Sequence, residues 1–182
     1  MTASPVLVHL PRIDNAEVFN ITQNSGSDQT FTSTTVPGVK FTVYAGSVLT
    51  RSDGSQPNPY PMTLVKIPLD RLPDAKPPVP NMSMSFLVSF GPVGTAASKQ
   101  VAVTYPNYAL SAPGTQMTLM TLDPTKGQMV PYGTGTVTSD AGQIEPDLDS
   151  ANPGQRFGIR NFDWHGPMPP PAPISPCPEG PG

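Results

Sequence analysis

The sequence has little of several features that define common classes of protein. It contains one cysteine in 182 residues, so no disulfide within the chain can hold its core together. Its 10 lysines and arginines form no basic cluster and stand against 13 acidic residues, which argues against nucleic acid as a partner. No apolar run approaches the roughly 20 residues that a membrane-spanning helix needs, so no membrane span is predicted. The first residues also lack the basic start and apolar stretch of a signal peptide.

Windows long enough for an α-helix are equally scarce, because proline and glycine interrupt the chain throughout. The sequence has 26 prolines and 16 glycines, and both residue types destabilise a helix interior. Between them lie short segments rich in Val, Thr, Phe, Tyr and Ile in which apolar and polar residues alternate. Alternation with a period of two is typical of strands that bury one face. The composition therefore predicts an all-β fold.

Several segments show this alternation clearly. Val39, Phe41 and Val43 would face the core, while the residues between them would face water. A longer apolar row at alternate positions from Met82 to Phe90 is interpreted as core filling, although a methionine-rich row can also form an adaptable binding surface. Further strands are predicted at residues 62–67, 101–105, 117–122, 129–132, 135–138 and 157–162. About eight strands at this spacing predict a two-sheet antiparallel β-sandwich of the immunoglobulin-like or Greek-key type.

Two proline-rich segments depart from the strand pattern. Residues 70–80 contain four prolines and are predicted to form an extended crossing between the sheets. The C-terminal end has few large apolar residues, so we expect an extended tail with polyproline-II character. The predicted organisation comprises N-terminal strands in residues 1–35, a β-sandwich domain in residues 36–167 and a proline-rich tail or linker in residues 168–182.

Most of the chain resembles a known kind of module. The likeness is carried by motifs in a fixed order, namely VPGVKFTVYAGS at 36–47, IPLDRLP at 67–73, VTYPN at 103–107, LSAPGT at 110–115, LDPTKGQMVPYGTGTV at 122–137 and WHG at 164–166. Over residues 36–168 these motifs resemble a β-sandwich module of large bacterial surface proteins and Rhs (YD-repeat) proteins. Residues 6–12, VLVHLPR, resemble the last strand of a transthyretin-like module that precedes it in such proteins.

This resemblance implies a role and a location. It implies a non-catalytic structural or adhesive module outside the cytoplasm, at the cell surface or in the extracellular space. The implied partners are neighbouring modules of a larger protein or other copies of the chain. The sequence departs from the family at residues 139–142, SDAG, where an Asp-Gly turn is more usual.

Four acidic residues form the best candidate for a metal site. They are Asp140, Glu145, Asp147 and Asp149. Calcium binds several oxygen ligands from one flexible loop, which such a cluster would supply. The segment that begins at Asp147 starts like an EF-hand loop, but its sixth position is not glycine and its twelfth, Gly158, has no carboxylate. A solvated acidic loop without a cofactor is therefore the preferred interpretation.

No other group of residues predicts a reactive site. Trp164 and His165 would form an aromatic platform with a titratable neighbour, but packing at the end of the last strand is the preferred interpretation. Two histidines and one cysteine without a short spacing do not predict a zinc site. No serine lies in a Gly-x-Ser-x-Gly motif, and a triad would have to recruit His9 or His165 from opposite ends of the chain. The sequence does not predict an enzyme.

The proline-rich tail is the candidate for self-association. Prolines lose little conformational entropy when they become ordered, so the tail would pack along its own domain or along a neighbouring copy, in the latter case as an assembly arm. The residues assigned to this contact are Pro169, Pro170, Pro171 and Cys177. In an oxidising compartment, the Cys177 thiol would cross-link the arm to a partner.

Two functions remain open from the sequence. The favoured one is a structural or assembly module of an extracellular bacterial protein or filament. The alternative is a carbohydrate- or calcium-dependent binding (adhesion) module, which Trp164, the tyrosines and the acidic cluster would support. An exposed row of aromatic side chains would favour sugar binding, whereas buried aromatic side chains would favour the structural role.

Overall fold

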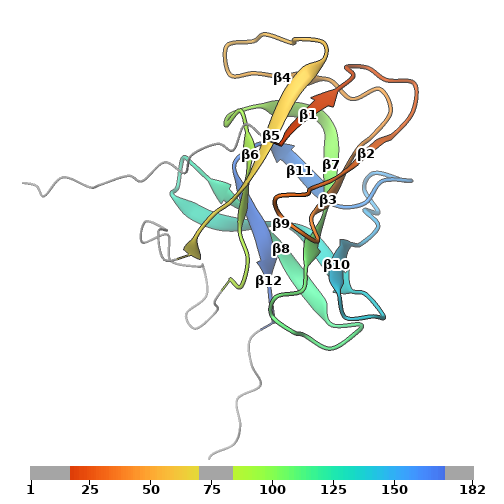
Figure 1. Ribbon diagram of the computed structural model, residues 1–182, viewed down its shortest axis with the longest axis vertical. Coiled ribbons are helices and arrows are strands. Elements are labelled where there is room, and N and C mark those ends of the chain that lie inside the picture. The colour runs from red at the N-terminus through yellow and green to blue at the C-terminus, as the bar shows by residue number, and fades with distance from the viewer. Residues whose placement is uncertain (1–16, 70–83, 171–182) are drawn as a thin grey trace, which may run out of the picture.

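Twelve β-strands make up the fold of residues 17–69 and 84–170, the part of the chain that the computed structural model describes (Figure 1). The strands are β1 (Val18–Ile21), β2 (Gln29–Thr32), β3 (Lys40–Val43), β4 (Leu49–Thr50), β5 (Tyr60–Lys66), β6 (Val88–Gly91), β7 (Ala96–Pro106), β8 (Gln116–Asp123), β9 (Gln128–Val137), β10 (Gln143–Pro146), β11 (Gly158–Asn161) and β12 (Trp164–Met168). No α-helix occurs in these two ranges. The prediction of an all-β fold is therefore confirmed.

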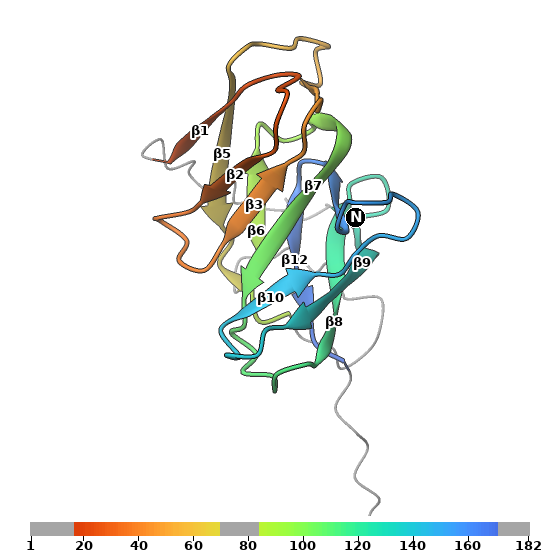
Figure 2. The same ribbon diagram turned by 90° about the vertical axis from the view of Figure 1, so that its right-hand side faces the viewer.

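The strands form one antiparallel sheet that curls into a nearly closed barrel (Figure 2). Hydrogen-bonded neighbours follow the order β1-β5-β6-β12-β8-β9-β10-β7-β3-β2, and β4 and β11 also pair with β7. The predicted sandwich of two separate sheets is not confirmed, because hydrogen-bonded strand pairs follow one another without a break from β1 to β2.

Strand β7 explains why the strands form one continuous sheet and not two separate sheets. It has eleven residues, enough to pair with β3 and β4 along one side and with β10 and β11 along the other. Val101 in its middle, for example, is the partner of Val43 on β3 and of Ile159 on β11. A long strand shared in this way lets a twisted sheet curve round on itself.

Most of the predicted strands are present, with shifted ends. In β3, Phe41 and Val43 are buried, and Lys40 and Thr42 are partly exposed, as the alternation predicts. The predicted strands at 62–67, 101–105, 117–122 and 157–162 correspond to β5, β7, β8 and β11. The two predicted at 129–132 and 135–138 are one strand, β9. The predicted extended crossing at 70–80 lies outside the described residues.

The row predicted from Met82 to Phe90 is only partly a strand. Strand β6 begins at Val88, and its residues on both faces are buried. It pairs with β5 along one edge and with β12 along the other. Phe86, Val88 and Phe90 lie in the main core, whereas Met84 packs against a second apolar cluster. Met82 lies outside the described residues.

Strand pairing joins both ends of the described chain to the barrel. Strands β1 and β2 lie within the N-terminal 35 residues, yet they pair with β5 and β3 and so belong to the same barrel. Strand β12 runs to Met168, into the predicted tail, and it pairs with β8 and β6. Alternation within a segment does not reveal such pairing, because the partner strands are distant in sequence.

Gly166 shows why a Gly-Pro sequence can sit in the middle of this sheet. A Cβ atom at Gly166 would lie 2.2 Å from the carbonyl oxygen of Phe86, so only glycine allows the two backbones to approach. The next residue, Pro167, is the register partner of Leu119 on β8. The close approach of the Phe86 backbone thus explains why this position of the strand is a glycine.

Two apolar clusters lie on opposite faces of the sheet. The larger one contains edge-to-face aromatic pairs that run from Phe19 to Phe41, with ring centroids 5.0 Å apart, and from Phe41 to Phe90 at 5.5 Å. The smaller one consists of Ile67, Leu87, Met120, Met129 and Met168, with Met84, Leu122 and Trp164 packed against it. Neighbours such as Leu119 and Met120 on β8 belong to different clusters, as expected when successive side chains of a strand point to opposite faces.

The barrel is held together by side chains at its seam between β1 and β2. These two strands stand at the ends of the pairing path. The Gln29 amide accepts a hydrogen bond from the Thr22 N–H at 2.8 Å and donates one to the Thr22 carbonyl at 2.9 Å, as a backbone partner would. The rings of Phe19 and Phe31 meet across the seam at 5.7 Å. Side-chain contacts therefore replace part of the missing strand pairing.

Candidate functional site

Asp140, the first of the four acidic residues predicted as a calcium site, shapes a turn. In the connection between β9 and β10, its carboxylate accepts a hydrogen bond from the Thr138 hydroxyl at 2.5 Å and one from the Gly142 N–H at 3.0 Å. These hydrogen bonds hold the pKa of Asp140 below its usual value. The carboxylate is therefore engaged by donors of its own turn.

The remaining carboxylates are also engaged one by one. Glu145 on β10 lies 3.8 Å from the Arg156 guanidinium in a solvent-exposed ion pair. Asp147 accepts hydrogen bonds from the hydroxyls of Thr134 at 2.6 Å and Thr136 at 2.7 Å. Within residues 17–69 and 84–170, no three Asp, Glu, His or Cys side chains are grouped so that they could hold a metal ion.

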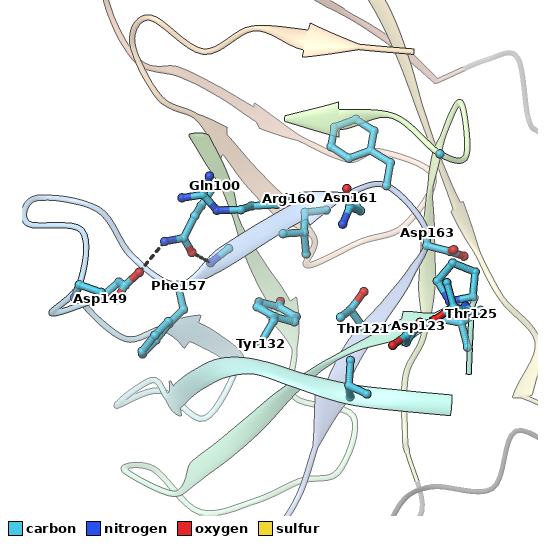
Figure 3. Close-up of a pocket in the computed structure, with 18 residues that line it drawn as sticks. Gln100, Thr121, Asp123, Thr125, Tyr132, Asp149, Phe157, Arg160, Asn161 and Asp163 are labelled. Carbon is cyan, nitrogen blue, oxygen red and sulfur yellow. Dashed lines mark hydrogen bonds between the residues drawn. The ribbon is translucent and has the colours of Figure 1, made fainter. Parts of the chain in front are cut away.

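Asp149 has a structural role in a chain of hydrogen bonds that joins three segments (Figure 3). Its carboxylate accepts from the Asn152 amide at 2.6 Å, from the Ala151 N–H at 2.9 Å and from the Gln100 amide. The bonds from Asn152 and Gln100 lower the pKa of Asp149. Gln100 on β7 in turn accepts from the Gly158 N–H at 2.7 Å. The β10–β11 connection is thereby tied to β7 and β11.

Trp164 and His165 lie at the start of β12 in different surroundings. His165 is fully buried, with its ring 6.0 Å from that of Phe90 and 6.2 Å from that of Tyr132. Its Nε2 accepts a hydrogen bond from the Asp163 N–H at 3.0 Å, and burial lowers its pKa to about 3. Trp164 is partly buried against the second apolar cluster. Both side chains occupy packing positions.

The proposed assembly arm lies mostly beyond the described chain. Pro169 and Pro170 follow β12 without belonging to a strand. Pro171 and Cys177 lie outside the described residues, so their role in self-association stays a prediction.

A pocket that the sequence did not predict opens in the wall of the barrel (Figure 3). Its volume is about 830 Å³, within the range of ligand pockets. It forms because β10 pairs with β9 only from Gly135 onward, while β11 pairs with β7 alone. The first half of β9 and the whole of β11 therefore face each other across the pocket, with no strand between them in the described chain.

The pocket combines apolar walls with charged groups at its ends. Figure 3 shows Tyr132 near the middle of the pocket and Phe157 toward one end. Asp149 lies at that end, while Asp123 and Asp163 lie at the other, and burial raises the pKa of Asp163. Such a mixture of aromatic walls and a few polar groups is typical of ligand pockets.

Comparison of the chain with protein-family models, with curated proteins and with solved structures found no match. Among the described residues, no helix has the length and apolar character needed to cross a membrane.

Sequence reasoning missed this pocket because its residues come from distant segments. Gln100, Tyr132 and Asp163 each stand in or beside a predicted strand, and no motif in the sequence contains all three. The only available signal was an irregular concentration of polar side chains around Phe157 to Asp163, where a regular strand was predicted. Their convergence depends on which strands pair, and that is a property of the whole sheet.

Proposed function

We propose that this chain is a non-catalytic structural or assembly module of an extracellular bacterial protein or filament. Its partners are neighbouring modules or other copies of the chain. Two observations support the proposal: the placement of the aromatic residues, which carries it, and the resemblance of residues 36–168 to modules of large bacterial surface proteins.

The aromatic side chains are used inside the protein. All thirteen Phe, Tyr and Trp residues lie in the described part of the chain, and only Tyr108 among them is exposed, at 46%. Tyr60 and Tyr105 are fully buried, and the Tyr105 hydroxyl is 2.9 Å from that of Tyr132. A sugar-binding sheet face would present several aromatic rings to solvent. This distribution favours a role in which a rigid core holds the module in shape.

The proposal is tested by binding and mass measurements on the purified full chain. Titration with a panel of oligosaccharides and with calcium should give no saturable heat change in calorimetry. Sedimentation analysis over a range of concentrations should show either self-association or association with an adjoining module of the same polypeptide. Saturable binding of one sugar, together with a monomer at every concentration, would refute the structural proposal.

The alternative, a carbohydrate-binding module, is favoured by one observation, the pocket between β9 and β11. Tyr132 and Phe157 provide apolar surface there, and Asn161 and Thr121 provide polar groups. A sugar that occupied this pocket would be detected by the same titration. The calcium-dependent form of the alternative has less support, because the predicted acidic ligands are engaged separately.

A further inference from the structure

The pocket between β9 and β11 contains charged groups that differ in how they are satisfied. Asp123 forms an ion pair with Lys126 at 3.1 Å, and Asp149 accepts the hydrogen bonds from Asn152 and Gln100 described above. The cation on the pocket wall, Arg160, donates to the Ser98 carbonyl at 3.1 Å. These groups already have partners within the protein.

Asp163 is the exception among the pocket carboxylates. It is partly buried, and among the described residues one hydrogen bond, from the Trp164 N–H to Oδ1 at 2.9 Å, reaches its carboxylate. It forms no ion pair with any described Lys, Arg or His side chain. Burial without a compensating cation disfavours its ionised form, which agrees with its raised pKa. A cation brought in from outside would relieve this cost.

The rest of the pocket suits a ligand polypeptide that has apolar side chains next to a positively charged one. Figure 3 shows Asp163 at one end of β11 and Phe157 at the other, with Tyr132 between them across the pocket. Strand β11 has a second edge that pairs with no described strand. An extended polypeptide lying along that edge would place alternate side chains into the pocket.

We propose that this pocket binds an extended segment of a neighbouring polypeptide through a lysine or arginine side chain. The charged group of that side chain pairs with Asp163, and apolar residues next to it in sequence contact Tyr132 and Phe157. The proposal rests on the assembly role proposed above and specifies where on this chain the partner binds. The net negative charge of the pocket, with three carboxylates against one arginine, favours a basic partner.

The test uses the full chain and two short peptides of the pattern apolar-Lys-apolar, one of them with norleucine in place of lysine. In NMR titrations, the lysine peptide should shift the signals of Thr121, Tyr132 and Asp163. The norleucine peptide should bind about tenfold more weakly, since one compensated charge is worth on the order of 1.4 kcal/mol. Equal affinities of the two peptides would overturn the proposal.

A pair of variants locates the contact. Asp163→Asn should weaken the lysine peptide about tenfold and leave the norleucine peptide unchanged. Asp140→Asn, which alters a carboxylate outside the pocket, should affect neither peptide.

If Asp163→Asn proves unfolded, the proposal is tested by the pH dependence of peptide binding to the unaltered protein. Affinity for the lysine peptide should fall as acid protonates Asp163, whose pKa is raised, before it protonates Asp123 and Asp149, whose pKa values are lowered. An affinity for the lysine peptide that stays constant while Asp163 becomes protonated contradicts the proposal.

The outcomes also separate this proposal from the general function. Failure of lysine selectivity, with self-association intact, rejects the pocket contact and leaves the assembly role standing. Shifts at Tyr132 and Asp163 caused by a simple pyranose, without any response to the lysine peptide and with a monomer at every concentration, reject both proposals in favour of a sugar-binding module.

Discussion

At the scale of single residues, Glu17 links the two strands at the ends of the sheet, β1 and β2. It precedes β1, and the residue is 5% exposed. It accepts hydrogen bonds from the Ser33 hydroxyl at 2.7 Å, from the Thr35 N–H at 3.1 Å and from the N–H and hydroxyl of Thr34 and the hydroxyl of Thr35. Burial alone would raise the pKa of Glu17, but the bonds from Thr35, Ser33 and Thr34 outweigh it and the pKa is lowered. The carboxylate therefore fastens the start of β1 to the turn after β2.

We expect Glu17→Gln to lower the free energy of unfolding by about 2–4 kcal/mol. Hydrogen bonds to a charged acceptor contribute about 1.5–3 kcal/mol, and the glutamine amide would place a donor against other donors. Urea denaturation measures the change. The matched control is Glu145→Gln, which breaks only an exposed pair and should cost less than about 1 kcal/mol. Equal effects of the two substitutions would show that Glu17 has no special role.

His165 should make stability depend on pH. Burial lowers its pKa from 6.5 to about 3, so between these values the unfolded chain binds a proton that the folded protein does not. The contribution to stability is complete above pH 6.5 and is lost as the pH falls from 6.5 toward 3. The expected slope is about 1.4 kcal/mol per pH unit.

The measurement is urea unfolding at several pH values between 6.5 and 5, above the range where the carboxylates titrate. His165→Gln should flatten the slope in this window, because glutamine does not titrate. A slope that survives His165→Gln contradicts the assignment.

At the scale of elements, β12 depends on the close approach of two backbones. A methyl group at position 166 would overlap the Phe86 carbonyl oxygen, 2.2 Å from the Cβ position. We therefore expect Gly166→Ala to destabilise the protein by about 1–3 kcal/mol or more, since overpacking forces the strands apart. Gly26→Ala, with no atom within 4 Å of the added Cβ, should cost little. Thermal unfolding compares the two, and similar melting temperatures would argue against close packing of β12.

At the scale of the whole molecule, the fold should not need a metal ion. The acidic residues of the predicted calcium site are held by separate protein donors, so no ligand cluster has to be neutralised. A ligand that binds only the native state raises the melting temperature by mass action. EDTA and added calcium should therefore leave the melting temperature unchanged in calorimetry. A drop of several degrees in EDTA that calcium reverses would revive the calcium-dependent alternative.

The sequence by itself determined the class of the fold and much of its core. Proline and glycine act locally on the backbone, so their abundance excludes long helices whatever the chain packs against. Alternation likewise reports which side chains share a face, and Phe41, Val43, Phe86 and Phe90 are buried as predicted. These inferences succeeded because their causes lie within a few residues.

The tertiary structure alone decided the closure of the barrel and the position of the pocket. Strand β7 pairs along both sides, Gly166 accepts the backbone of residue 86, and Glu17 binds a turn about seventeen residues away. The carboxylates of the predicted calcium site were neighbours in sequence but were separated by strand pairing, whereas Asp163 and Tyr132 were brought into one pocket by it. Hydrogen-bond partners of strands are chosen among distant segments by the packing of the whole sheet, and local pattern carries no record of that choice.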